Sequence, residues 1–301
     1  MANWILKAVV QKGVSFLPGS HKINYFFQRH VTRGLVLNDD LFTDRLTHCR
    51  DHLDSYYKYN GKPGFVCHEL GTGWFPIVPL GFWLCGASEI HTLDLSPLIR
   101  QENLNKTLSF FKKWAGEGRL DKFLPQLQKD RLNLLLGWDT FESEKFGLHF
   151  HNGDATKLLG SLPPANLSVS NNVLEHVHES FVGPITSSMF SALQPGGVMS
   201  HFIDMSDHFA HADKSITIYN FLKFSDSSWK WINNSVQPMN RLRIYDYHEK
   251  FAEAGLLIRE EISRTPDMEV FRSVALNEKF KEKPPEETAV SHSRFVFVKP
   301  D

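Results

Sequence analysis

The spacing of apolar residues changes near residue 60. Over residues 1–60, apolar and aromatic side chains recur at helical spacing without an alternating run, which predicts several short helices as an N-terminal helical extension. Over residues 61–301, short apolar runs alternate with glycine turns and amphipathic stretches. That pattern predicts an α/β domain in which strands and helices follow one another along the chain.

The first two apolar runs of this domain enclose a glycine turn. Residues 65–70 predict a strand that leads directly into Gly71-Thr72-Gly73, and Pro76 opens an apolar helix that ends near Leu84. A second strand at residues 89–94 completes a β-α-β unit, which favours a parallel sheet with a right-handed crossover.

The later pattern predicts the rest of the sheet. Residues 97–145 have helical spacing and exceed what a crossover needs, so we expect a helical insertion there. Further strands are expected to start at residues 147, 166 and 197, followed by a helix at 247–254, strands at 256–262 and 294–298, and a solvated connection at 279–288. Together these elements predict a Rossmann-like seven-stranded mixed sheet with helices on both faces.

Composition narrows the class of protein. A chain of 301 residues with 42% hydrophobic content can bury a full core, which excludes a disordered or fibrous protein. Its 33 basic and 34 acidic residues give a net charge of -1, so we expect no nucleic-acid partner. Three cysteines without CxxC pairing favour a reducing compartment, and no apolar run approaches the about 20 residues of a membrane span. We therefore expect a cytoplasmic protein without a transmembrane segment.

Polar residues at the predicted strand ends indicate a cofactor site. Ligands of open parallel sheets bind at the carboxyl ends of the strands. Gly71 and Gly73 allow close backbone approach there, and Asp94 can accept hydrogen bonds from the hydroxyls of a ribose. A pyrophosphate cofactor calls for a third glycine at the position of Pro76, and Glu69 would repel it. A nicotinamide-dependent oxidoreductase is therefore a less favoured alternative, whereas Glu69 suits a cationic amine.

Five segments in this order resemble the motifs of class I S-adenosylmethionine-dependent methyltransferases. They are Glu69-Leu70-Gly71-Thr72-Gly73, His91-Thr92-Leu93-Asp94, Asn152-Gly153-Asp154-Ala155, Ser170-Asn171-Asn172-Val173-Leu174-Glu175-His176 and Leu193-Gln194-Pro195-Gly196-Gly197. The resemblance covers about residues 64–300. It departs from many family members at Trp74-Phe75-Pro76, where they carry smaller residues.

The resemblance implies S-adenosyl-L-methionine as the cofactor and assigns residues to its parts. Glu69, Gly71 and Gly73 would hold the methionine end and Asp94 the ribose. Asp154 and Ala155 would contact the adenine, and Asn171 would line the backbone side of the cofactor.

Simpler structural roles stay open for each of these residues. The glycines could form a plain strand-to-helix turn, and Asp94 could cap a helix that starts at Pro97. Asp154 could be a turn residue before its helix, and Asn171 and Asn172 could cap another.

Methyl transfer to a hydroxyl needs a base that faces the methyl group. His208 is our candidate, with Asp204 or Asp207 orienting it and His176 as a further candidate, although any of these histidines could be a packing or solvated residue. The segment 201–211 also carries ligand types for a divalent metal, which remains possible. No metal is predicted, because spacing fixes no third ligand beside Asp207 and His211.

The predicted function is O-methylation of a small-molecule or glycan acceptor. Aromatic residues at 219–231 and the donors of Asn240-Arg241-Leu242-Arg243 suit a polar, ring-shaped acceptor, or else form a packed lid. Enzymes that methylate amino groups of nucleic-acid bases carry Asn/Asp-Pro-Pro-aromatic after the fourth strand, where this chain has Asn171-Asn172-Val173-Leu174. The alternative is a catalytically silent, cofactor-binding regulatory subunit; the sequence predicts no oligomeric state.

Overall fold

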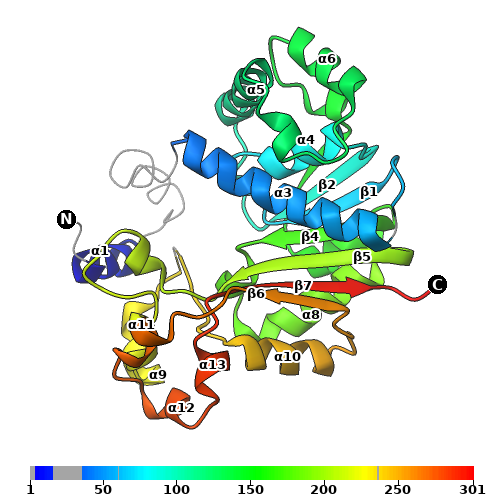
Figure 1. Ribbon diagram of the computed structural model, residues 1–301. Coiled ribbons are helices and arrows are strands. Elements are labelled where there is room, and N and C mark those ends of the chain that lie inside the picture. The colour runs from blue at the N-terminus through cyan, green and yellow to red at the C-terminus, as the bar shows by residue number, and fades with distance from the viewer. Residues whose placement is uncertain (1–3, 16–35, 60, 236) are drawn as a thin grey trace.

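A seven-stranded sheet forms the centre of the computed structural model (Figure 1), which describes residues 4–15, 36–59, 61–235 and 237–301. Its strands lie in the order β3-β2-β1-β4-β5-β7-β6. Their bounds are β1 Val66–Leu70, β2 Glu89–Asp94, β3 Leu148–Asn152, β4 Ala165–Asn171, β5 Leu193–Asp204, β6 Glu260–Ser263 and β7 His292–Val298. The first five strands are parallel, and β7 runs antiparallel to β5 and β6. The predicted mixed sheet is confirmed.

The register of the strands brings the candidate residues to one edge. Leu70 pairs with Leu93 and with Ser170, and Asn171 pairs with Phe202. The residues that follow these positions therefore meet at the carboxyl ends of β1, β2, β4 and β5. Since β1 lies between β2 and β4, the chain order reverses here, which is where open α/β sheets bind ligands.

Helices cover both faces of the sheet (Figure 1). One face packs against α3, α4, α5 and α6, and the opposite face packs against α7, α8 and α10. The helices are α1 Trp4–Ser15, α3 Asp39–Tyr59, α4 Ile77–Leu84, α5 Gln101–Gly116, α6 Lys129–Gly137, α7 Ala155–Leu158, α8 Glu179–Ser191, α9 Asp226–Ile232, α10 Ile244–Glu253, α11 Met268–Arg272, α12 Glu278–Lys281 and α13 Pro285–Thr288.

Helix α3 crosses the sheet over the ends of β4 and β5 (Figure 1). It is one 21-residue helix rather than several short ones. Phe42, Leu46, Cys49 and Leu53 recur every three to four residues and enter the same core as the sheet. The aromatic residues Phe16 and Tyr25-Phe26-Phe27 lie outside the described residues. The domain boundary at residue 60 remains a prediction, although α3 packs as part of the sheet's own core.

The connecting segments follow the expected pattern with one difference. Residues 97–145 contain α5 and α6, as the helical spacing predicts. Residues 279–288 do not form a plain solvated connection, since α12 and α13 lie there and Phe280 is buried. Phe280 joins a third apolar cluster with Phe209, Tyr219 and Trp229, which holds α1, α9, α11 and α12 together.

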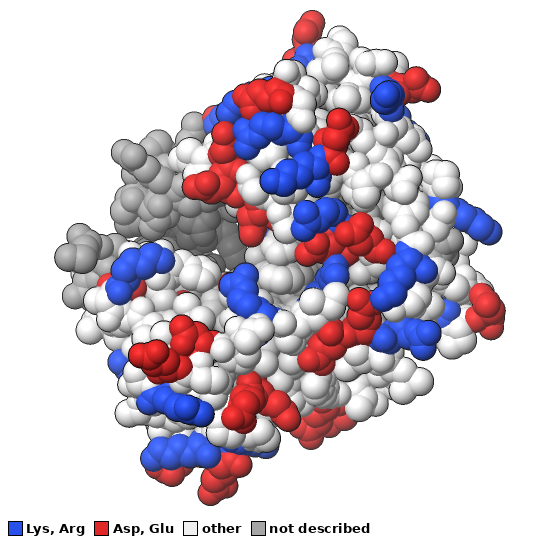
Figure 2. All heavy atoms as spheres, viewed as in Figure 1, with Lys and Arg blue, Asp and Glu red and all other residues white. Residues whose placement is uncertain are grey.

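Two surface properties bear on partners. Within the described ranges, no helix combines the length and apolarity needed to cross a membrane. Figure 2 shows acidic and basic side chains interspersed on the face that carries α3.

Candidate active site

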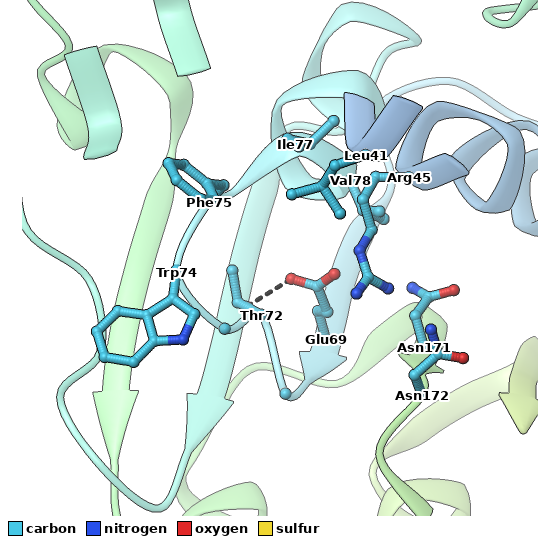
Figure 3. A pocket seen from close by; sticks show the side chains of 12 residues that line it. Leu41, Arg45, Glu69, Thr72, Trp74, Phe75, Ile77, Val78, Asn171 and Asn172 are labelled. Atoms are coloured by element: carbon cyan, nitrogen blue, oxygen red, sulfur yellow. Dashed lines mark hydrogen bonds between the residues drawn. The ribbon is translucent and has the colours of Figure 1, made fainter. Parts of the chain in front are cut away.

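A pocket opens where the ends of β1 and β4 meet α3 (Figure 3). Its volume is about 210 Å³. It is lined by Leu41, Arg45, Glu69, Gly71, Thr72, Gly73, Trp74, Phe75, Ile77, Val78, Asn171 and Asn172. The structure thus brings together four of the predicted cofactor residues, namely Glu69, Gly71, Gly73 and Asn171.

The glycine turn has a backbone that other residues cannot easily adopt. Gly71 and Gly73 have φ angles of +78° and +72°. A Cβ on Gly71 would lie 2.3 Å from Cγ2 of Val173, so the turn and the segment after β4 touch each other directly. The Gly71 N–H donates to the carbonyl of Leu93 at 2.8 Å, which fixes the turn against β2.

Glu69 places a buried carboxylate on the pocket wall. Glu69 is only 2% exposed, and one of its carboxylate oxygens accepts a hydrogen bond from the Thr72 hydroxyl at 2.5 Å. Burial raises the pKa of Glu69 to about 8, and the nearby Asp94 carboxylate adds to that rise. A carboxylate so poorly compensated favours a cationic ligand.

Arg45 supplies the opposite charge. Its guanidinium descends from α3 and lies between the side chains of Glu69 and Asn171 (Figure 3). The side chain is 31% exposed and has Asp44 at 4.0 Å, a distance at which an exposed ion pair is weak. The pocket therefore offers both a carboxylate and a guanidinium, a combination suited to the ammonium and carboxylate of an amino acid.

His52 orients the amide of Asn171. The buried His52 ring has Nε2 at 2.8 Å from Oδ1 of Asn171 and Nδ1 at 2.7 Å from the Ser200 hydroxyl. Because Oδ1 is engaged, Nδ2 of Asn171 is left as a donor, and it is buried without a hydrogen bond to the described part of the chain. An N–H donor on the wall of a pocket is what a ligand carboxylate or ring nitrogen would need.

The helix-cap alternatives for Asp94 and Asn171 do not hold. Oδ2 of Asp94 accepts a hydrogen bond from the Gly73 N–H at 3.3 Å, while α5 begins only at Gln101 without a side-chain cap. Burial raises the pKa of Asp94 to about 7. The short 3-10 helix η4 (Leu174–His176) after β4 also lacks a side-chain cap, so neither Asn171 nor Asn172 has that role there.

Asp154 has the capping role that was left open. It accepts hydrogen bonds from the Thr156 backbone N–H at 3.0 Å and from the Thr156 hydroxyl at 2.7 Å, at the start of α7. Its neighbour Ala155 is buried. Capping leaves the second carboxylate oxygen of Asp154 unengaged apart from Lys157 at 3.9 Å, so its contact with an adenine stays a prediction.

The predicted base lies beside one of its two candidate partners. Nε2 of His208, on the 3-10 helix η5 (His208–His211), is 3.3 Å from Oδ2 of Asp204. The carboxylate of Asp207 instead accepts from the Asn220 amide at 3.1 Å and the Phe209 N–H at 2.9 Å. Asp204 is therefore the carboxylate that can orient His208.

Asp204 is surrounded by imidazoles. Besides His208, Nε2 of His292 on β7 lies 3.3 Å away and Nε2 of His211 lies 3.8 Å away. Burial alone would raise the pKa of Asp204, but hydrogen bonds from His208 and His292 outweigh it and bring the pKa well below its ordinary value. Asp204 is thus held as a carboxylate.

His176 packs against His208. Their rings meet edge to face with centroids 4.9 Å apart, and Nδ1 of His176 lies 2.5 Å from the carbonyl of Pro238. Burial and the neighbouring His208 lower the pKa of His176 to about 4, so it is neutral. His201 lies apart, bonded to the Ser170 hydroxyl at 2.7 Å with a pKa lowered by burial to about 3.

Several residues of the site were missed in the sequence. Arg45 and His52 belong to no motif, and the one local signal for them is that polar residues at positions 45, 48 and 52 recur at helical spacing beside the apolar face of α3. His292 stands in the last strand and carries no motif. Glu175 was seen only as part of a motif and received no role.

Comparisons with known proteins give structural likeness and no sequence match. No family model and no curated protein matches this chain. It is similar to a Haemonchus contortus phosphoethanolamine N-methyltransferase 2 in complex with S-adenosyl-L-methionine, at 15% identity, TM-score 0.45, covering 83% of this chain and 52% of that one. This chain thus spans about half the length of that protein.

Two further structures show likeness of the same order. One is an O-methyltransferase family protein from Burkholderia thailandensis, at 10% identity, TM-score 0.46, covering 91% of this chain and 61% of that one. The other is a magnesium protoporphyrin IX methyltransferase from Synechocystis PCC 6803 with bound SAH, at 11% identity, TM-score 0.45 and 88% coverage of each chain.

Proposed function

We propose that this protein is an S-adenosylmethionine-dependent methyltransferase. The observation that carries the proposal is the charge arrangement of the pocket, where Glu69 and Arg45 face each other beside the unpaired amide N–H of Asn171. The cofactor ends in an amino acid, whose ammonium suits Glu69 and whose carboxylate suits Arg45 and Asn171. Asp94, at the next strand end, is available for the two ribose hydroxyls.

The same charges disfavour a dinucleotide. A pyrophosphate at the glycine turn would lie beside Glu69 and Asp94, both buried or half-buried carboxylates. Either the phosphates or the carboxylates would have to be neutralised, and Arg45 is the one cation in the described pocket lining.

For the chemistry, we propose transfer of the methyl group to a hydroxyl of a small polar or carbohydrate acceptor. His208 would accept the hydroxyl proton while Asp204, 3.3 Å away, orients the ring and stabilises the imidazolium that forms. The acceptor class, like the cytoplasmic location, is a prediction from the sequence.

The test is calorimetric titration of the purified protein with S-adenosylmethionine, S-adenosylhomocysteine and NAD. We expect binding of both sulfur nucleosides and none of NAD. Asp94→Ala and Glu69→Gln should each weaken this binding by about 100-fold, since each loses a charge-assisted hydrogen bond in a buried site. Asp139→Ala, which removes an exposed carboxylate outside the pocket, is the matched control.

The outcomes separate the alternatives. Binding of NAD in place of the sulfur nucleosides would support the alternative of a nicotinamide-dependent oxidoreductase. Cofactor binding without turnover across a screen of hydroxyl acceptors, together with no effect of His208→Ala, would indicate the silent regulatory subunit.

A further inference from the structure

Three potential metal ligands converge beside the pocket. Glu175 and His176 belong to η4 after β4, and His208 belongs to η5 after β5. One ligand atom from each of the three side chains lies within 4.8 Å of the others. We call these residues the Glu175–His176–His208 cluster.

The carboxylate of Glu175 makes no ion pair within the described residues, and the charge of Arg45 acts on it without direct contact. The residue is 2% exposed, and neither of its oxygens makes a hydrogen bond within the described part of the chain. The neighbouring carboxylate of Asp204 adds a second negative charge. An isolated buried carboxylate is costly unless it is protonated, paired or bound to a metal ion, so this position favours a cation.

Each of the two histidines can present one ring nitrogen as a lone-pair donor. Nδ1 of His176 can donate its proton to the Pro238 carbonyl, which leaves Nε2 unprotonated, as in many metal-binding histidines. Nε2 of His208 lies 3.3 Å from Oδ2 of Asp204, so the ring can direct its proton there and keep the lone pair on Nδ1, which lies 3.5 Å from the amide nitrogen of Gln237. A carboxylate behind a ligating imidazole fixes the ring and raises its basicity.

We propose that the Glu175–His176–His208 cluster binds one divalent first-row transition-metal ion. Two imidazoles and one carboxylate are a known donor set for Zn²⁺, Fe²⁺ and Co²⁺, whereas Mg²⁺ prefers oxygen ligands. With metal–ligand bonds of about 2.1 Å, neighbouring donors lie about 3–3.5 Å apart, so binding would draw these side chains together by about 1 Å. Three protein ligands leave coordination positions open.

The inference deepens the proposed function and in its catalytic part rests on it. A hydroxyl of the acceptor bound at an open position would lose its proton more easily, because the metal lowers its pKa. His208 would then hold the metal, and the proton would pass to solvent water while the oxygen forms its bond to the methyl group and the bond from that group to the sulfonium sulfur breaks. Metal binding as such does not depend on the cofactor.

A second group of histidines is a competing candidate for metal binding. On the edge of β2 and β3, the His91 ring stacks between those of His149 and His151, with Nδ1 of His91 3.0 Å from Nε2 of His151. Glu89 lies 3.0 Å from His91. This group lacks a buried unpaired carboxylate and provides the control variant His151→Gln.

The experiment is a titration of the chelator-treated protein with Co²⁺, followed by the visible absorption of the bound ion. We expect one tightly bound Co²⁺ per chain, competed by Zn²⁺ and unaffected by excess Mg²⁺. Glu175→Gln, which keeps the shape of the side chain, and His208→Gln should each weaken binding by at least about 100-fold, since changes behind the ligands alone cost roughly 10–100-fold. His151→Gln should leave it unchanged.

Two results would overturn the site. One is the absence of tight Co²⁺ binding to the folded wild-type protein, and the other is tight binding that survives in Glu175→Gln and is lost in His151→Gln. Thermal unfolding of each variant verifies that it is folded. Cofactor affinity is measured on the same preparations, so failure of the proposed function would appear separately from failure of the metal site.

Discussion

The strand ends around the pocket and the histidine-rich surroundings of Asp204 hold buried carboxylates in opposite electrostatic states. At the carboxyl ends of β1 and β2, burial raises the pKa of Glu69 to about 8 and that of Asp94 to about 7, because few donors or cations face them. Asp204 is as well buried, yet two histidines hold its pKa well below the ordinary value. The difference teaches that neighbouring groups decide the charge of a buried carboxylate. Glu69 lacks a close cationic partner and favours a cationic ligand, whereas Asp204 is already hydrogen-bonded by histidines.

The largest effect that would sharpen this contrast concerns His208. We expect His208→Ala to lower the methyl-transfer rate by about 1000-fold, because a positioned base or a metal ligand is lost. The affinity for S-adenosylmethionine should stay within about twofold, since His208 does not line the pocket. Steady-state kinetics and calorimetry measure the two quantities. His248→Ala, at an exposed histidine, is the control. If His208→Ala lowered cofactor affinity as much as it lowered the rate, the pocket and the surroundings of Asp204 would not have separate roles.

The next effect tests whether the backbone defines the pocket. Gly71→Ala should lower the free energy of unfolding by about 2–4 kcal/mol, because it combines a φ of +78° with a contact of 2.3 Å to Val173. Cofactor binding should fall with it. Denaturant unfolding measures the change. Gly137→Ala, where no atom lies within 4 Å of the new Cβ, should have little effect on stability; equal losses for both variants would refute the argument.

A smaller effect concerns pH. Below about pH 8 the unliganded pocket holds a proton on Glu69, and binding an ammonium group must release it. Affinity for S-adenosylmethionine should therefore rise with pH, approaching tenfold per unit between about pH 6 and 7.5. The groups facing Glu69 are Asp94, which raises its pKa, and Arg45, which lowers it.

Glu69→Gln provides the control for this pH dependence. It should bind weakly with a flatter profile, because the remaining slope comes from Asp94 alone. Calorimetry in buffers of different ionisation enthalpy should also detect proton release by the wild type. A flat wild-type profile would show that Glu69 is not the partner of the ammonium.

The smallest effect concerns His52, which acts through Asn171. We expect His52→Leu to weaken cofactor binding by about 3–10-fold, because the Asn171 amide would no longer be oriented and one hydrogen bond to the ligand would be weakened. In an Asn171→Ala background, His52→Leu should have no further effect on affinity. Calorimetry on the four proteins of this cycle measures the coupling. Additive losses would mean that His52 acts only on stability.

The fold could be predicted because its signals are local. Alternating apolar runs, the Gly71-Thr72-Gly73 turn and the stop at Gly255, which has a φ of +72°, each depend on neighbouring residues. The strands at 89–94 and 294–298 were located almost to the residue. The difference at residues 279–288 arose because burial of Phe280 depends on distant partners that the charged sequence does not reveal.

The site residues likewise divide into those with a local sequence signal, which could be predicted, and those without one. Glu69 and the glycines could be found because one short segment forms much of the pocket wall. Arg45, His52 and His292 could not, because helix α3 and strand β7 reach the site only through packing and strand pairing. The sequence leaves Asp204 and Asp207 as equal partners for His208, and they are distinguished by the 3.3 Å contact of Asp204 with His208 and by the engagement of Asp207 by Asn220.

Strand β7 has a consequence for the order in which the site is completed during synthesis. Every residue lining the pocket precedes β5 in the chain, so the ribosome delivers the pocket residues first. The surroundings of Asp204 are completed only by β7, which lies between β5 and β6 and brings His292 to Asp204. The residues of the pocket are thus synthesised before the strand that completes the surroundings of Asp204, and pairing of β7 with β5 is the step that brings His292 into place.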